Sequence, residues 1–149
     1  MNKILILLTI SPLLCAGQKL KIVNHANAII FSGISSAQIH DSLKSAGFTV
    51  VDKDSAHFET LSRQYKVLEH GNLILKFERT DSVIIMTGIC NEVAGQALLR
   101  PYGNKWRQAR KTALGTVEGE AFNLMKEFAE HQPCRKQYMK AMLPPVETK

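Results

Sequence analysis

A basic and aromatic segment is the part of this sequence best suited to bind a ligand. Residues 100–111 hold five positive charges and two large aromatic rings but no acid. The residues concerned are Arg100, Tyr102, Lys105, Trp106, Arg107, Arg110 and Lys111. Arginine and lysine bind phosphate groups, and tryptophan and tyrosine stack on bases or sugars. We therefore predict that an anionic ligand contacts this segment, which we call the basic segment.

A structural interpretation of the basic segment stays open beside the functional one. Trp106 could anchor a solvated loop to the core. The basic side chains would then point to water or pair with acids of the following segment. The acids available there are Glu118, Glu120 and Glu127.

Two further constellations contain catalytic residue types without the spacing that catalysis needs. Cys90, Asn91 and His131 have the residue types of a thiol protease, but no local motif supports that site. Asp52 and Asp54 could be paired catalytic acids, but two acids beside Ser55 are typical turn formers. We expect neither set to be catalytic.

Metal and cofactor motifs are absent from the sequence. It contains no Gly-rich phosphate loop, no Gly-x-Ser-x-Gly and no His-Glu-x-x-His. None of its histidines stand at close metal-ligand spacing; they are His25, His40, His57, His70 and His131. The sequence predicts no bound metal and no cofactor.

The first seventeen residues have the layout of a secretory signal peptide. Lys3 precedes an apolar stretch from Ile4 to Leu14, and small residues follow at Ala16 and Gly17. The apolar stretch is too short to span a bilayer, which takes about 20 residues. We expect cleavage near Gly17 and an exported chain, periplasmic or secreted, with no transmembrane segment.

Cys15 allows a second interpretation of the amino terminus, in which the chain is lipidated. The stretch from Leu13 to Ala16 is similar to the lipobox of bacterial lipoproteins, in which the cysteine is acylated. Leu14 departs from that motif, which usually has Gly, Ala or Ser before the cysteine. The alternative to simple cleavage is therefore a lipoprotein anchored through Cys15.

The other two cysteines are candidates for a disulfide. Cys90 and Cys134 form an even pair, and an exported protein meets an oxidising compartment. A bond between them would close a loop of about 45 residues and stabilise the fold by roughly 3–4 kcal/mol. Two unpaired, buried thiols are the alternative, because sequence does not give the distance between the two Cα atoms.

The middle of the chain alternates between helix and strand signals. A strand is expected within 19–31, followed by a helix that begins after a Ser35–Gln38 capping box and ends at Gly47. Short strands with tight turns follow up to Cys90, and such connections predict an antiparallel meander. A short helix is possible within 92–99.

The carboxyl-terminal part predicts one long amphipathic helix. Thr116 is the expected N-cap, and an apolar stripe from Val117 to Phe128 faces away from a row of charges. The charged row consists of Glu118, Glu120, Lys126, Glu127 and Glu130. Pro133 ends this helix or begins another helical turn that runs toward Met142.

The expected class is α+β: an antiparallel meander with an early helix and a long C-terminal helix packed on one face. Residues 18–143 form the single domain and 144–149 a flexible tail.

The order of these elements resembles that of small exported Gram-negative proteins. The resemblance lies in 35–88, with the capped helix, the stretch from Ala46 to Val50, the acidic turn at Asp52 to Asp54, and a strand ending in Met86, Thr87 and Gly88. Lipoproteins of the outer-membrane assembly machinery and secreted families of helix-grip or TATA-binding-protein-like fold look like this. The resemblance implies a binding or scaffold role and no catalytic residue.

Composition agrees with one globular domain and leaves two functions to compare. The 149 residues are 45% hydrophobic, and the net charge of +6 falls to +5 when Lys3 leaves with the leader. We expect a non-enzymatic exported module that binds an envelope protein, a glycan or an anionic lipid headgroup, and not nucleic acid. The alternative is a small secreted hydrolase whose anionic substrate binds the basic segment.

Overall fold

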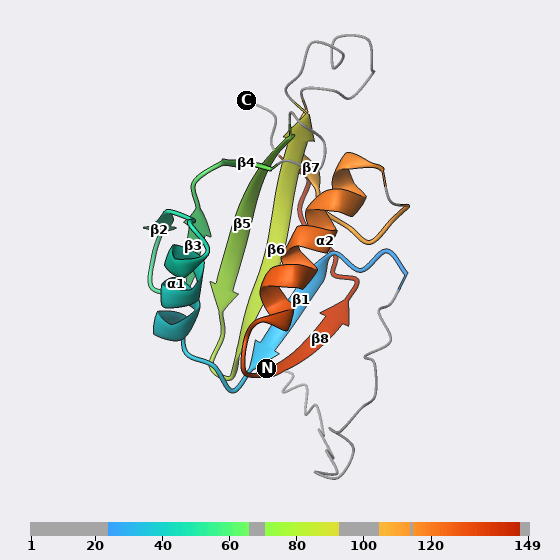
Figure 1. Ribbon diagram of the computed structural model, residues 1–149. Helices are drawn as coiled ribbons and strands as arrows, with labels where there is room; N and C mark the ends of the chain where they lie inside the picture. Colours follow the sequence, from blue (N-terminus) through green and yellow to red (C-terminus); the bar gives the residue numbers. More distant parts are fainter. Residues whose placement is uncertain (1–23, 66–70, 93–104, 114, 147–149) are drawn as a thin grey trace.

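The computed structural model describes residues 24–65, 71–92, 105–113 and 115–146. Within them the chain has an α+β fold, with one antiparallel sheet and two helices (Figure 1). The elements are β1 (Ala28–Ser32), α1 (Ser36–Ser45), β2 (Val50–Asp52), β3 (His57–Thr60), β4 (Arg63–Tyr65), β5 (Gly71–Arg79), β6 (Val83–Glu92), β7 (Arg107–Gln108), α2 (Val117–Glu130) and β8 (Arg135–Met139). No helix among these residues is long and apolar enough to cross a bilayer. The predicted fold class is confirmed.

The sheet is built around the long β5–β6 hairpin. Its strand order is β2-β3-β5-β6-β1-β8, while β4 pairs with β5 and β7 with β6. The turn between β5 and β6 is closed by Thr80, whose backbone N–H donates to the Val83 carbonyl oxygen at 3.0 Å. The chain from β2 to β6 is the expected meander. Both ends of the chain then complete the sheet, because β1 lies between β6 and β8.

Helix α1 begins and ends as its local sequence predicts. The Ser35 side chain accepts a hydrogen bond from the Gln38 backbone N–H, and the Gln38 side chain accepts one from the Ser35 N–H. At the other end Gly47 has φ 84°, a left-handed conformation that costs glycine little. The Phe48 N–H then reaches back to the Leu43 carbonyl oxygen at 2.9 Å, which completes a Schellman cap.

Helix α2 crosses the middle of the sheet at close range (Figure 1). Its N-cap is Thr116, whose hydroxyl accepts from the Gly119 N–H at 3.1 Å. The helix passes over Gly88 of β6, where an added Cβ would lie 2.7 Å from the Met125 Sδ. The absence of a side chain at Gly88 leaves this space to the Met125 side chain of α2.

A row of aromatic rings joins both helices to the same face of the sheet. His40 of α1 lies edge-on to Phe58 of β3, with the ring centroids 4.3 Å apart. Phe58 stacks on Phe77 of β5 at 4.7 Å, and Phe77 meets Phe128 of α2 at 6.3 Å. Because these contacts continue from one helix to the other, both helices cover one face of the sheet.

In the C-terminal part, one of the two alternatives left open after Pro133 and one expectation about burial were wrong. Residues 135–139 form strand β8 rather than a helical turn, because the free edge of β1 offers them backbone partners. Asn27 reinforces the pairing, since its side chain exchanges hydrogen bonds with the backbone of Ala141 at 2.7 and 2.9 Å. Glu120, expected on the solvent face of α2, is buried and accepts a hydrogen bond from the Gly115 N–H.

The structure does not support the predicted disulfide. Cys90 and Cys134 are both free thiols. Cys134 directly precedes Arg135, which lies beside Ser32 and so next to the Val83 end of β6. Cys90 is seven residues farther along β6, or about 24 Å at the usual strand rise. A disulfide needs Cα atoms within about 7 Å, so this register excludes the bond.

Some expectations fall on residues outside the described ranges. They are the leader with Cys15, the first part of the strand at 19–31, the possible helix at 92–99, Arg100, Tyr102 and the last residues of the tail.

Phe128→Ala should reduce the free energy of unfolding by about 3–5 kcal/mol, because it removes a buried ring and leaves a cavity. Denaturant unfolding followed by circular dichroism measures the change. Glu127→Ala, at the exposed neighbouring position, is the control and should change stability by less than about 0.5 kcal/mol. A loss of less than about 1 kcal/mol for Phe128→Ala would contradict its place in the core.

Candidate binding site

The second half of the basic segment is fixed to the sheet by backbone hydrogen bonds. Arg107 and Gln108 form β7, which pairs with Cys90 and Ile89 of β6. The Ala109 N–H then donates to the Gly88 carbonyl oxygen at 2.8 Å, and the Lys111 N–H donates to that of Ala26 at 2.7 Å. These bonds hold the segment beside the amino-terminal end of α2.

Three of the predicted binding residues meet at one open pocket. Its volume is about 640 Å³, within the range of small-molecule sites. The lining consists of Trp106, Arg107, Gln108, Arg110, Glu118, Pro145 and Val146. Lys105 and Lys111 are not part of this lining. The structure thus brings together the tryptophan and two of the arginines that the sequence singled out.

The two arginines of the pocket have different electrostatic surroundings. The Arg107 Nη1 lies 3.3 Å from the Glu118 Oε1, and the two side chains are only 24% and 14% exposed. One basic side chain therefore pairs with α2, as the structural interpretation of the basic segment proposed. Arg110 is exposed and has no ion-pair partner among the described residues. Its backbone N–H, not its guanidinium, binds the helix, at the Glu118 carbonyl oxygen.

The pocket also depends on residues that sequence reasoning did not select. Gln108 donates from its side-chain amide to the Pro144 carbonyl oxygen at 3.0 Å. This bond holds the C-terminal stretch, assigned to a flexible tail from its sequence, at the place where Pro145 and Val146 line the pocket. Nothing in the local sequence signals this contact, because the partners are 36 residues apart.

Cys90 lies buried beneath Arg107, but its environment makes it a poor nucleophile. Burial first and the nearby Glu118 carboxylate second raise the pKa of the thiol to about 12, against the opposing effect of the Arg107 charge. The sulfur interacts with the Arg107 carbonyl oxygen at 3.5 Å. A thiol with this pKa is protonated at neutral pH, and nucleophilic attack needs the thiolate.

The histidine of the thiol-protease constellation lies at the far end of α2. His131 is the C-cap, and its Nδ1 lies 2.7 Å from the Glu127 carbonyl oxygen. Glu118, near Cys90, is in the first turn of the same helix, about 20 Å away at the helical rise. The structure therefore separates Cys90 from His131.

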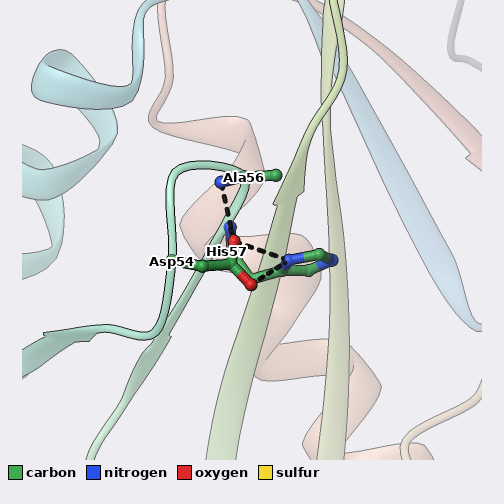
Figure 2. Close-up of polar contacts among 3 residues, drawn as sticks. All are labelled: Asp54, Ala56 and His57. Atoms are coloured by element: carbon green, nitrogen blue, oxygen red, sulfur yellow. Dashed lines mark hydrogen bonds and ion pairs between the residues drawn. The ribbon is translucent and has the colours of Figure 1, made fainter.

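Asp54 shapes a turn, as expected for one of the two candidate acids. Its Oδ1 accepts from the backbone N–H groups of Ala56 and His57, each at 2.8 Å. Figure 2 shows the His57 ring against the same carboxylate, with its Nδ1 2.8 and 2.9 Å from the two oxygens. The hydrogen bond from Ala56 and that from the His57 side chain lower the pKa of Asp54. Asp52 lies 3.5 Å from the His40 Nε2 and is not part of this turn.

Comparisons with protein-family models, with curated proteins and with solved structures find no match to this chain. Within the described ranges, no three histidine, cysteine or acidic side chains are placed to hold a metal ion. The interpretation of the site accordingly rests on the geometry of the pocket.

Cysteine labelling tests the two thiols. At pH 8 in the folded protein, iodoacetamide should modify Cys134, which is partly exposed, much faster than Cys90, which is fully buried with a pKa of about 12. In denaturant without reductant both should react, as peptide mass spectrometry would show. A peptide pair linked through Cys90 and Cys134 would contradict the free thiols.

The Asp54 turn should contribute to stability in a pH-dependent way. Because its pKa is lower in the folded chain than the ordinary 3.8, ionised Asp54 stabilises the fold above that pH. The contribution is lost as the pH falls through the lowered value. The melting temperature of Asp54→Asn should therefore lie below that of the parent protein at pH 6, and the difference should shrink in acid. Asp41→Asn, on an exposed site of α1, is the control. A difference that is equal at all pH values would contradict this role.

Proposed function

We propose that this chain is an exported, non-enzymatic binding module of the bacterial envelope that holds an anionic ligand in the Trp106–Arg110 pocket. The observation that carries the proposal is the exposed Arg110 guanidinium at a pocket that Trp106 also lines. The guanidinium can bind a carboxylate, sulfate or phosphate, and the indole offers a flat apolar surface beside it. Export rests on the leader at 1–17 and stays a prediction from the sequence.

The Arg107–Glu118 pair supports recognition rather than turnover. The pair holds the Arg107 side chain in one position at the wall of the pocket, so little side-chain entropy remains to be lost when a ligand binds. Because the pair is internally neutralised, Arg110 supplies the net charge that selects an anion. Of the ligands considered from the sequence, an anionic glycan suits this lining best, since sugar rings stack on indole while their hydroxyls bind amide and guanidinium groups.

A hydrolase acting on an anionic substrate at the same site is the alternative. It needs a nucleophile or a general base in the pocket. Glu118 is the only carboxylate of the described lining, and it is engaged by Arg107. The Cys90 thiol beneath has its pKa raised to about 12, which disfavours covalent catalysis.

Arg110→Glu should raise the dissociation constant for a sulfated polysaccharide about tenfold. This factor corresponds to the free energy of one charge-assisted hydrogen bond. Trp106→Ala should weaken binding by a similar factor through the loss of stacking. Both affinities are measurable by titration calorimetry, with phosphatidylglycerol vesicles as the lipid probe. Lys44→Glu, an equal change of net charge on α1, is the matched control and should bind like the parent protein.

Several outcomes would contradict the proposal. One is that Arg110→Glu and Trp106→Ala bind both probes as tightly as the parent protein. Another is that Lys44→Glu loses as much affinity as Arg110→Glu, which would indicate attraction by net charge alone. Hydrolysis of the polysaccharide by the parent protein but not by Glu118→Gln would favour the enzyme.

A further inference from the structure

The segment that follows β8, residues 140–146, lies against the domain without entering its core. None of these residues belongs to the buried core cluster of the described chain. Pro144 and Pro145 are exposed, and the Met142 side chain is fully exposed. Burial of apolar surface therefore contributes little to holding this segment in place, and the core is complete without it.

Side-chain hydrogen bonds hold the segment at two points. At its start, the Asn27 side chain exchanges two partly buried hydrogen bonds with the Ala141 backbone. Three residues later, the Gln108 amide donates to the Pro144 carbonyl oxygen at 3.0 Å, and this bond is exposed to solvent. The second attachment can therefore open while the first one stays closed.

Two consecutive prolines give the segment a preferred extended shape. Each proline ring fixes φ at about −65°, and a residue that precedes proline avoids the helical region. Leu143 and Pro144 both precede a proline, so 143–145 favours the polyproline II conformation. No turn or helix interrupts residues 140–146. Such a segment loses little conformational entropy on binding, and its carbonyl oxygens are free to accept hydrogen bonds.

The surface beside the segment has the chemistry that recognises such chains. Proteins that bind polyproline II segments present aromatic rings to the prolines. Here Trp106 lines the same pocket as Pro145 and Val146. Gln108, which the pairing of β7 with β6 fixes beside Ile89, supplies the donor for a proline carbonyl oxygen. An aromatic ring and an amide donor thus meet a Pro-Pro segment at one place.

We propose that Trp106 and Gln108 form a recognition site for an extended Pro-Pro segment of a partner protein. In the free chain its own Pro144 and Pro145 occupy this site, which we call the proline site. The partner's segment binds by displacing them, and the chain bends away at Met142 while Ala141 stays attached to Asn27. The short tether keeps the chain's own segment at an effective concentration of about millimolar, so that it competes with the partner.

The proline site shares Trp106 with the anionic ligand proposed above but depends on a different polar group. An anion needs the Arg110 guanidinium, whereas a proline segment needs the Gln108 amide. A neutral proline segment gains no charge interaction from Arg110. The two proposals are therefore separable by experiment, and either one can fail without the other.

Intrinsic fluorescence tests the proline site, because Trp106 is the only tryptophan of the sequence. In the full chain, the double variant Pro144→Gly with Pro145→Gly removes the extended preference of the segment and releases it. Trp106 emission should then shift to longer wavelength, since water replaces the prolines beside the ring. A circular dichroism spectrum and an unfolding midpoint close to those of the parent protein establish that the double variant is folded.

The released site should bind the same segment from a second molecule. The capped, neutral peptide Met-Leu-Pro-Pro-Val has the sequence of 142–146. It should bind the double variant at least about tenfold more tightly than the parent protein, in which the chain's own segment masks the site. Adding Gln108→Glu to the double variant should weaken peptide binding about tenfold, because an acceptor replaces the donor. Adding Arg110→Glu, or Gln137→Glu at an exposed position of β8, should leave the peptide affinity unchanged.

Four results would overturn the proposal. They are unchanged Trp106 emission in the double variant, equal peptide affinity of the double variant and the parent protein, equal binding of a peptide with alanine in place of both prolines, and no effect of Gln108→Glu. The segment would then only pack against the domain. Failure of the sulfated polysaccharide to bind through Arg110 contradicts the anionic ligand alone, because the peptide carries no charge.

Discussion

The close packing of α2 on β6 at Gly88 is the constraint on which most of the structure depends. An added Cβ there would lie 2.7 Å from the Met125 Sδ and 3.3 Å from the Ala109 Cβ. Side chains of the helix and of the segment after β7 therefore pack over the same position of the central strand, in space that a side chain at Gly88 would contest. Because interiors are packed at crystal-like density, displacement of the helix at this point would disturb all three elements together.

The same contact builds the pocket. With α2 held against β6, the first turn of the helix brings Glu118 beside β7, where it pairs with Arg107. The hydrogen bond from the Ala109 backbone N–H to the Gly88 carbonyl oxygen holds β7 against the part of β6 that α2 covers. Trp106 and Arg110, on either side of this short strand, then face the pocket. The position of the candidate site thus follows from the packing of the core rather than from a flexible loop.

The sequence by itself determined the elements whose signals are local. The capping box at Ser35, the left-handed Gly47, the Thr116 N-cap and the Asp54 turn all have hydrogen-bond partners within a few residues. Tertiary structure alone decided that 135–139 form a strand, that Cys90 and Cys134 lie far apart, and that Pro145 joins Trp106 at the pocket. Helix periodicity and caps are short-range properties of the chain, whereas strand register is set by partners distant in sequence. Glu120 is a further example: its charge predicted exposure, but the side chain is buried and accepts a hydrogen bond from the Gly115 backbone N–H in the turn before α2.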